Sequence, residues 1–144
     1  MRARTAPRRV VSDHVARALE ASPPRSHAMG ITGSRGRAAE TLAAAFLELQ
    51  GLEVVERNVR LAGVEVDVLA VERGVQVVVE VKFRSRSDYG GALEALDADK
   101  RARLRRAALV LAARRDADVR IDLIAVELEP EGAVLRHVRG AVSG

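Results

Sequence analysis

Residues 63–84 read GVEVDVLAVERGVQVVVEVKFR, and this stretch decides the fold. Its two halves are rich in β-branched residues, have the length of ordinary strands and flank an Arg-Gly pair, which predicts an antiparallel hairpin. Side chains two apart on a strand share a face. Glu65 therefore points with Asp67, and Glu80 points with Lys82. Charged groups inside such apolar strands are costly unless they are neutralised or used, so chemistry is expected here.

The composition places the chain among soluble globular proteins. Its 144 residues suit one domain, and a core of that size folds without staples. The absence of cysteine excludes disulfides and thiolate metal sites. No apolar run approaches the roughly 20 residues that span a bilayer, so we expect a cytoplasmic protein with no membrane partner. The net charge of +4 resides in residues 1–28, so it says little about the partners of the remainder.

The chain divides into a tail and a domain. Residues 1–28 combine prolines with scattered arginines and are predicted to be a disordered N-terminal tail. They lack the apolar stretch of a secretory signal. Residues 29–144 are predicted to be the functional domain, and Met29 is a second candidate beside Met1 for the translation start.

The periodicity of the domain predicts an α/β fold, a mixed central sheet flanked by helices in the order αβββαββ. The first helix is apolar nearly all round, which indicates that it packs against a sheet. The expected elements are a helix at about 34–50, a strand at 52–61, the hairpin at 63–84, a helix at about 97–115, and strands at 119–127 and 133–138.

The carboxylates of the hairpin suit a metal-dependent site. Neighbouring strands lie about 4.8 Å apart, so Asp67 and Glu80 reach one Mg²⁺ or Mn²⁺ if the register brings them opposite each other. Lys82 would hold the attacking water or stabilise charge in the transition state of phosphodiester hydrolysis. The chain has 22 arginines and two lysines, yet a lysine stands inside this strand. The alternative is a structural salt bridge of Lys82 with either acid.

Two further groups of residues leave alternatives open. Glu40 lies on an apolar stripe of the first helix and either points toward the sheet or is a solvated residue of the first turn. Basic residues crowd the second helix and follow the hairpin, and they either contact phosphates or form an ordinary solvated face. These basic residues are Arg84, Arg86, Lys100, Arg101, Arg103, Arg105 and Arg106.

An ordered series of residues resembles the YraN family of small bacterial proteins over about residues 33–127. The matching residues are Gly36, Ala39, Glu40, Ala43, Phe46, Leu47, Gly51, Arg57, Asn58, Arg60, Gly63, Glu65, Val66, Asp67, Val79, Glu80, Val81, Lys82, Arg84, Tyr89, Gly90, Lys100, Arg120 and Asp122.

That family is similar to restriction-endonuclease-like nucleases, in particular archaeal Holliday-junction resolvases. The resemblance implies a restriction-endonuclease-like fold with a Glu on the first helix, an Asp on the second strand and Glu-x-Lys on the third. These correspond to Glu40, Asp67, Glu80 and Lys82. It implies a Mg²⁺- or Mn²⁺-dependent endonuclease acting on DNA, with RNA as the alternative partner and a homodimer for a resolvase-like role. The competing hypothesis is a catalytically silent nucleic-acid-binding or scaffold module that keeps the fold.

Overall fold

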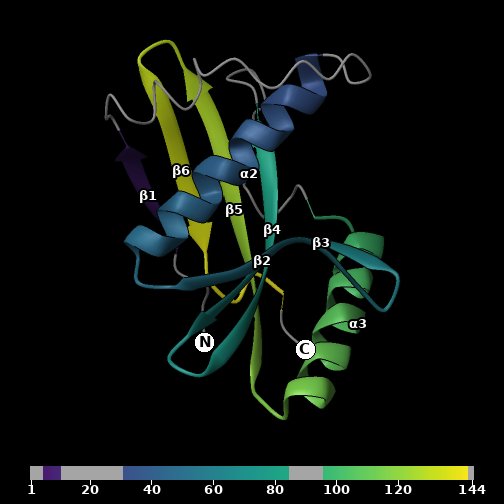
Figure 1. Cartoon of the computed structure of the whole chain (residues 1–144). Helices are drawn as coiled ribbons and strands as arrows, with labels where there is room; N and C mark the ends of the chain where they lie inside the picture. Colours follow the sequence, from purple (N-terminus) through teal and green to yellow (C-terminus); the bar gives the residue numbers. More distant parts are fainter. Residues whose placement is uncertain (1–4, 11–30, 85–95, 143–144) are drawn as a thin grey trace.

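The computed structural model describes residues 5–10, 31–84 and 96–142. Six strands form one sheet in the order β1-β6-β5-β4-β3-β2 (Figure 1). All neighbouring pairs are antiparallel except β4 and β5, which are parallel and are joined by the crossover helix α3. The elements are β1 (Thr5–Val10), α2 (Ile31–Leu49), β2 (Glu53–Leu61), β3 (Val64–Glu72), β4 (Val75–Arg84), α3 (Ala98–Arg115), β5 (Val119–Glu129) and β6 (Gly132–Val138).

The predicted hairpin is formed by β3 and β4. Glu72 pairs with Val75, which leaves Arg73 and Gly74 as a two-residue loop with φ of 49° and 82°. A two-residue loop with positive φ at both positions matches the right-handed twist of the strands, and glycine adopts the second position at no steric cost.

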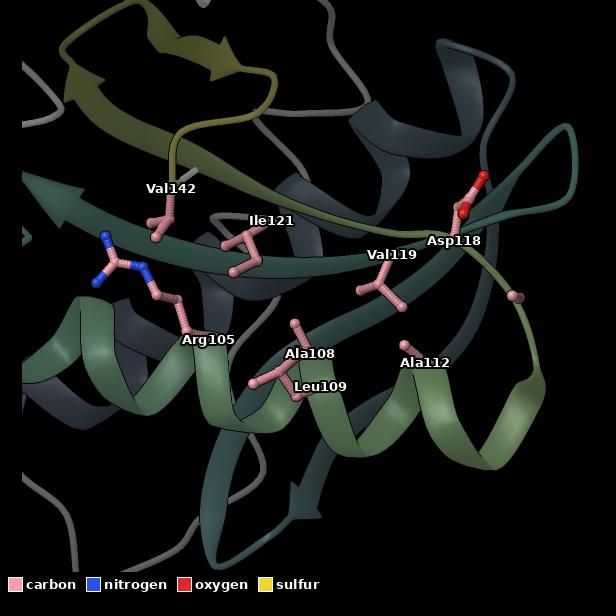
Figure 2. A pocket seen from close by; sticks show the side chains of 9 residues that line it. Arg105, Ala108, Leu109, Ala112, Asp118, Val119, Ile121 and Val142 are labelled. Carbon is pink, nitrogen blue, oxygen red and sulfur yellow. The ribbon is translucent and has the colours of Figure 1, made fainter. Parts of the chain in front are cut away.

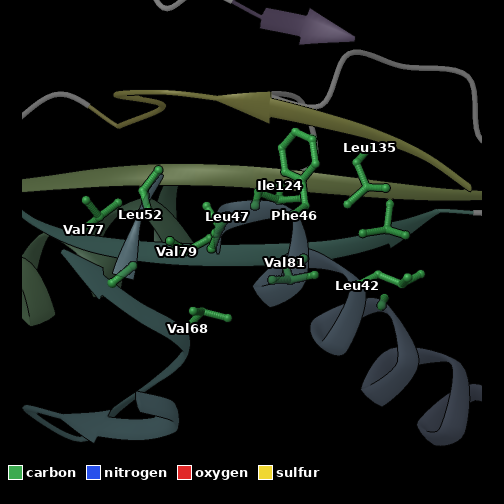
Figure 3. Close-up of a cluster of buried hydrophobic side chains, with 14 of the residues drawn as sticks. Leu42, Phe46, Leu47, Leu52, Val68, Val77, Val79, Val81, Ile124 and Leu135 are labelled. Atoms are coloured by element: carbon green, nitrogen blue, oxygen red, sulfur yellow. The ribbon is translucent and has the colours of Figure 1, made fainter. Parts of the chain in front are cut away.

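Helix α2 covers one face of the sheet. Its apolar residues pack on the odd-numbered side chains of β4 and on β5, and Figure 3 shows Leu47 beside Val79 and the ring of Phe46 beside Ile124. The helix is apolar over most of its surface because it lies against the centre of the sheet, as predicted.

Helix α3 covers the opposite face. Leu104, Ala107 and Leu111 recur at helical spacing, are buried, and pack in a second cluster with Val78. Since successive side chains of a strand alternate between faces, the even-numbered residues of β4 point toward α3. Glu80 is one of these residues, and this places it on the α3 face.

The structure confirms the order αβββαββ and the mixed sheet flanked by helices. It differs from the sequence prediction in the N-terminal region, where Thr5–Val10 is an edge strand paired with β6 rather than part of a disordered tail. Such a strand is difficult to predict from a segment with Pro7 and two adjacent arginines, because its pairing depends on β6 far along the chain. Residues 11–28 and Met29 lie outside the described residues. Within the described ranges, no helix is long and apolar enough to cross a membrane.

Candidate functional site

The strands β3 and β4 separate where the two predicted carboxylates lie. Their pairing runs from Glu72 with Val75 to Val68 with Val79 and ends there. Beyond this point the Asp67 side chain replaces the backbone of β3 as a hydrogen-bond partner of β4. Its Oδ2 accepts a hydrogen bond from the N–H of Val81 at 2.8 Å. An unpaired buried N–H costs about 1–3 kcal/mol, so this contact satisfies the strand end and fixes the Asp67 side chain.

Glu80 is the most deeply buried acid of the site, with 4% of its surface exposed. Two ammonium groups converge on its Oε1 atom: Lys100 Nζ at 3.3 Å and Lys82 Nζ at 3.8 Å. Its other oxygen, Oε2, is buried and accepts no hydrogen bond from any described residue. When Glu80 carries a proton, its carboxyl group hydrogen-bonds the carboxylate of Asp67, so Oε2 is without a partner in the charged state. A buried carboxylate oxygen left in this state is unusual and indicates a missing partner.

The two hairpin acids affect each other's protonation. Burial and then the charge of Asp67 raise the pKa of Glu80 to about 7, although Lys100 and Lys82 oppose the shift. Burial also raises the pKa of Asp67, while the Val81 N–H and Lys100 act in the opposite direction. Two close carboxylates in a low-dielectric site resist carrying two charges, so a proton or a cation is favoured between them.

Glu40 extends the site from α2. It is half-buried, and burial followed by the charge of Asp67 raises its pKa, so the strand acid acts on the helix acid. The side chain of Asn58 hydrogen-bonds Glu40 and lowers its pKa in part. Asn58 has a φ of 51°, a left-handed conformation that asparagine tolerates better than most residues. The periodicity left Glu40 undecided, and the family resemblance placed it among the site residues, whereas the contact of Asn58 with Glu40 was not predicted.

Lys100 enters the site from the first turn of α3. Asp97 caps the helix, and its Oδ1 accepts a hydrogen bond from the backbone N–H of Lys100 at 2.7 Å. Lys100 lies one turn before the buried Leu104, so it belongs to the stripe that faces the sheet. The sequence analysis grouped Lys100 with the phosphate-contacting arginines, but the structure places it against Glu80.

The predicted basic residues separate into two sets. Arg103, Arg105 and Arg106 are exposed along α3, and Arg101 is half-buried beside Lys100. These four arginines, which we call the basic ridge, follow Lys100 along α3 on both flanks of its buried stripe. The Arg84 side chain and all of Arg86 lie outside the described residues.

The donor atoms of the site fit a magnesium or manganese ion. Asp67 and Glu80 supply hard oxygen ligands, and the buried Oε2 of Glu80 lacks any other described partner. Within residues 31–84 and 96–142, no group of three metal-ligating side chains comes together. Magnesium is commonly held by one or two carboxylates together with water and substrate phosphate, and the Asp67–Glu80 pair matches that requirement.

A second group of buried charges, which we call the Asp122 network, was missed by sequence reasoning. Asp122 is fully buried and accepts from Arg120 Nε at 2.8 Å and the Gly140 N–H at 3.0 Å, while His137 Nε2 lies 2.8 Å from its Oδ2. Burial alone would raise the pKa of Asp122, but the contacts with His137, Arg120 and Gly140 outweigh it and hold the pKa below its ordinary value. The available signal was Arg120-x-Asp122, a charged pair in an apolar strand.

This network extends to the exposed side through Glu72. The Glu72 carboxylate accepts from Arg120 Nη2 at 2.7 Å and from Arg139 Nη1 at 2.6 Å. The members of the network are therefore Glu72, Arg120, Asp122, His137 and Arg139.

A shallow apolar groove lies apart from both charged groups. It has a volume of about 310 Å³ and runs between the second half of α3, β5 and Val142. Figure 2 shows Leu109 and Ala112 of the helix opposite Val119 and Ile121 of the strand. None of its lining residues belongs to the carboxylate site.

Residues 39–126 match the model of a family described as "Uncharacterised protein family UPF0102". This match spans Asp67, Glu80, Lys82, Lys100 and Arg120-x-Asp122. The chain belongs to the UPF0102 family. The YraN resemblance of the sequence is thereby confirmed, since YraN and UPF0102 name the same family.

The relatives of this UPF0102 chain cover most of its described domain. A UPF0102 protein of Paenarthrobacter aurescens is 41% identical over 73% of this chain and 90% of its own length. One from Halorhodospira halophila is 44% identical over 65% of this chain and 77% of its own, and one from Dechloromonas aromatica is 46% identical over 68% and 82%.

A solved structure shares a more distant likeness. SfsA of Pyrococcus furiosus, in complex with Ca²⁺, has a TM-score of 0.31 and 15% identity to this UPF0102 chain. The match covers 78% of this chain and 65% of SfsA, so the chain spans just under two thirds of that protein. The likeness is too distant to bear on function.

Proposed function

We propose that this chain is a nucleic-acid-binding, metal-dependent endonuclease that hydrolyses phosphodiester bonds, with DNA as the expected substrate and RNA as the alternative. The observation that carries the proposal is the buried Oε2 of Glu80, which lacks a described partner although two ammonium groups reach the same carboxylate. A structural salt bridge would be expected to satisfy both oxygens of a buried acid.

Each residue of the site has a distinct task in this proposal. Asp67 and Glu80 would hold Mg²⁺ or Mn²⁺, which supplies Lewis-acid polarisation of a phosphoryl oxygen and a more acidic water. Lys82 has 36% of its side chain exposed at the mouth of the site, where it would donate to the attacking water or to a phosphoryl oxygen. Glu40 would accept a proton or support that water from the helix side.

The basic ridge would position the substrate. Arg103, Arg105 and Arg106 are exposed on the helix that carries Lys100, with Arg103 and Arg106 on one flank and Arg105 on the other. A phosphate backbone that reaches the carboxylates would pass along one of these flanks. Contacts of this kind bind phosphates without reading bases and weaken as salt rises. A junction substrate would further require two copies of the chain, one for each cleaved strand.

The test is a cleavage assay with Mg²⁺ or Mn²⁺ on duplex, four-way junction, flap and RNA substrates. We expect Glu80→Ala and Lys82→Met to lower cleavage by about a hundredfold or more. Glu53→Gln is the matched control, since this exposed acid of β2 lies outside the site. Failure of the wild type to cut any of the four substrates would sink the enzyme proposal.

A second candidate is a binding or scaffold module without catalysis. The observation that favours it is the convergence of Lys82 and Lys100 on Glu80, which neutralises the acid without a metal. In that case Asp67→Ala would bind the same substrates as the wild type, and Mg²⁺ would not change the melting temperature of either protein.

A further inference from the structure

Both lysines of the chain meet at one carboxylate. The sequence contains 24 lysines and arginines together, and only Lys82 and Lys100 are lysines. They come from different elements, β4 and α3, and yet both contact Glu80 Oε1. The two positions that contact Glu80 are therefore lysines, whereas every other Lys or Arg position of the chain is an arginine.

The chemical difference between the two residues explains the choice. A guanidinium forms a planar fork that binds a carboxylate through two parallel hydrogen bonds and is difficult to displace. An ammonium on a flexible four-carbon stem is a compact point charge that can leave. A permanent structural ion pair would favour arginine at this position, whereas a temporary one favours lysine.

Lys100 is the closer of the two lysines and reaches further into the site. Its Nζ atom is 3.3 Å from Glu80, and its charge also lowers the pKa of Asp67. Its backbone is held by the Asp97 cap, while 27% of its side chain is exposed. The helix end is thus fixed, and the ammonium retains a route to solvent.

We propose that Lys100 is a displaceable counter-ion, which neutralises the Asp67–Glu80 pair until a divalent cation takes its place. This rests on the metal site proposed above and adds a function for a residue outside the Glu-x-Lys pattern. On displacement, the Nζ atom leaves Glu80 Oε1 and turns toward the basic ridge, where a substrate phosphate would receive it. Metal loading and substrate binding are coupled through this one side chain.

The direct test measures Mn²⁺ binding to the full chain by titration calorimetry, without nucleic acid and at low ionic strength. We expect Lys100→Met to bind Mn²⁺ about tenfold more tightly than the wild type, because one competing unit charge is removed at close range. Lys100→Arg should bind more weakly than the wild type, since a forked pair resists displacement. Arg114→Met is the control for loss of one charge from the same helix, because Arg114 is exposed at its far end.

The outcomes separate this inference from the proposed function. Equal Mn²⁺ affinity in the wild type, Lys100→Met and Lys100→Arg, with binding lost in Glu80→Gln, overturns the counter-ion role and leaves the metal site standing. Absence of binding in every variant overturns both. Circular dichroism and melting curves of each variant establish that a change in affinity is not a loss of fold.

Discussion

Two buried carboxylates of this protein, Glu80 and Asp122, have opposite surroundings. Asp122 is fully buried and receives hydrogen bonds on both of its oxygens, and its pKa is held below the ordinary value. Glu80 is almost as buried, but one of its oxygens has no described partner and its pKa is raised to about 7. Burial alone therefore does not distinguish Asp122, which stabilises the folded state, from Glu80, whose charge destabilises it.

The different surroundings indicate a structural role for Asp122 and a functional role for Glu80. The Asp122 network is complete within the chain, so nothing further needs to bind there. The carboxylate site is incomplete, and incomplete polar sites in native proteins are often functional. Substitutions in the two groups should therefore change the stability of the protein in different ways.

The largest effect is expected from Asp122→Asn. The substitution removes a buried charge that Arg120 and His137 contact, so the free energy of unfolding should fall by about 3 kcal/mol. Urea denaturation followed by circular dichroism measures the loss. Asp118→Asn is the control, since Asp118 is exposed at the start of the same strand. A loss below about 1 kcal/mol, within the range of ordinary surface substitutions, would contradict the structural role.

Glu80→Gln should act in the other direction. Because the folded pKa of Glu80, about 7, exceeds its ordinary value of 4.5, the folded state binds more protons than the unfolded state between these pH values. Stability of the wild type therefore falls as pH rises from about 4.5 to about 7. Glutamine removes that cost, and we expect about 2 kcal/mol of added stability at pH 8 and little change at pH 4.

The measurement for Glu80→Gln is urea denaturation at the two pH values without divalent metal. Glu53→Gln, on the exposed surface of β2, provides the control for loss of an acid. Equal destabilisation at both pH values would mean that Glu80 serves the fold in the way that Asp122 does.

A smaller effect on the free energy of unfolding is expected at acidic pH, where Asp122 becomes protonated. The folded pKa of Asp122 is depressed, so its contribution to stability is present above its unfolded pKa near 3.8 and is lost as pH falls through the folded value. The wild type should lose stability below about pH 4 more steeply than Asp122→Asn. If the free energy of unfolding falls equally with pH in the wild type and Asp122→Asn, the network does not stabilise the charged form of Asp122.

The smallest effect is expected from Arg139→Met. Arg139 binds Glu72 at the exposed end of the network, with 38% of its side chain accessible, and Arg120 holds the same carboxylate. Partly exposed ion pairs contribute little, so the free energy of unfolding should change by about 0.5 kcal/mol. A loss as large as that of Asp122→Asn would mean that the network acts as one unit to its outer edge.

Much of the fold was predictable because short-range sequence patterns determine its helices and its hairpin. The spacing of apolar residues predicted both helices, and β-branched runs around Arg-Gly predicted the hairpin. The hairpin brought Asp67 and Glu80 within reach of each other on the condition of a suitable register, and the pairing of Val68 with Val79 supplies that register. These inferences need only contacts within one element or between adjacent elements.

What remained unpredicted depends on contacts between distant segments. Lys100 meets Glu80 only because the crossover places α3 on the even-numbered face of β4, although its spacing from Leu104 already indicated a buried stripe. His137 meets Asp122 only after β6 pairs with β5. Arg120 and Asp122 are charged residues inside the apolar strand β5, which is the same signal that marks Asp67 and Glu80 in the hairpin.

The parallel pairing of β4 with β5 determines when the site is assembled during folding. Antiparallel hairpins with two-residue loops close within microseconds, so β3 and β4 can bring Asp67 and Glu80 together early. The pairing of Gln76 with Val119 must wait for the whole crossover, and such non-local contacts form slowly. Lys100 reaches Glu80 only at that late step. Asp67 and Glu80 therefore stay hydrated beside Lys82 while the hairpin forms, and they are desolvated only as the second counter-charge, Lys100, arrives.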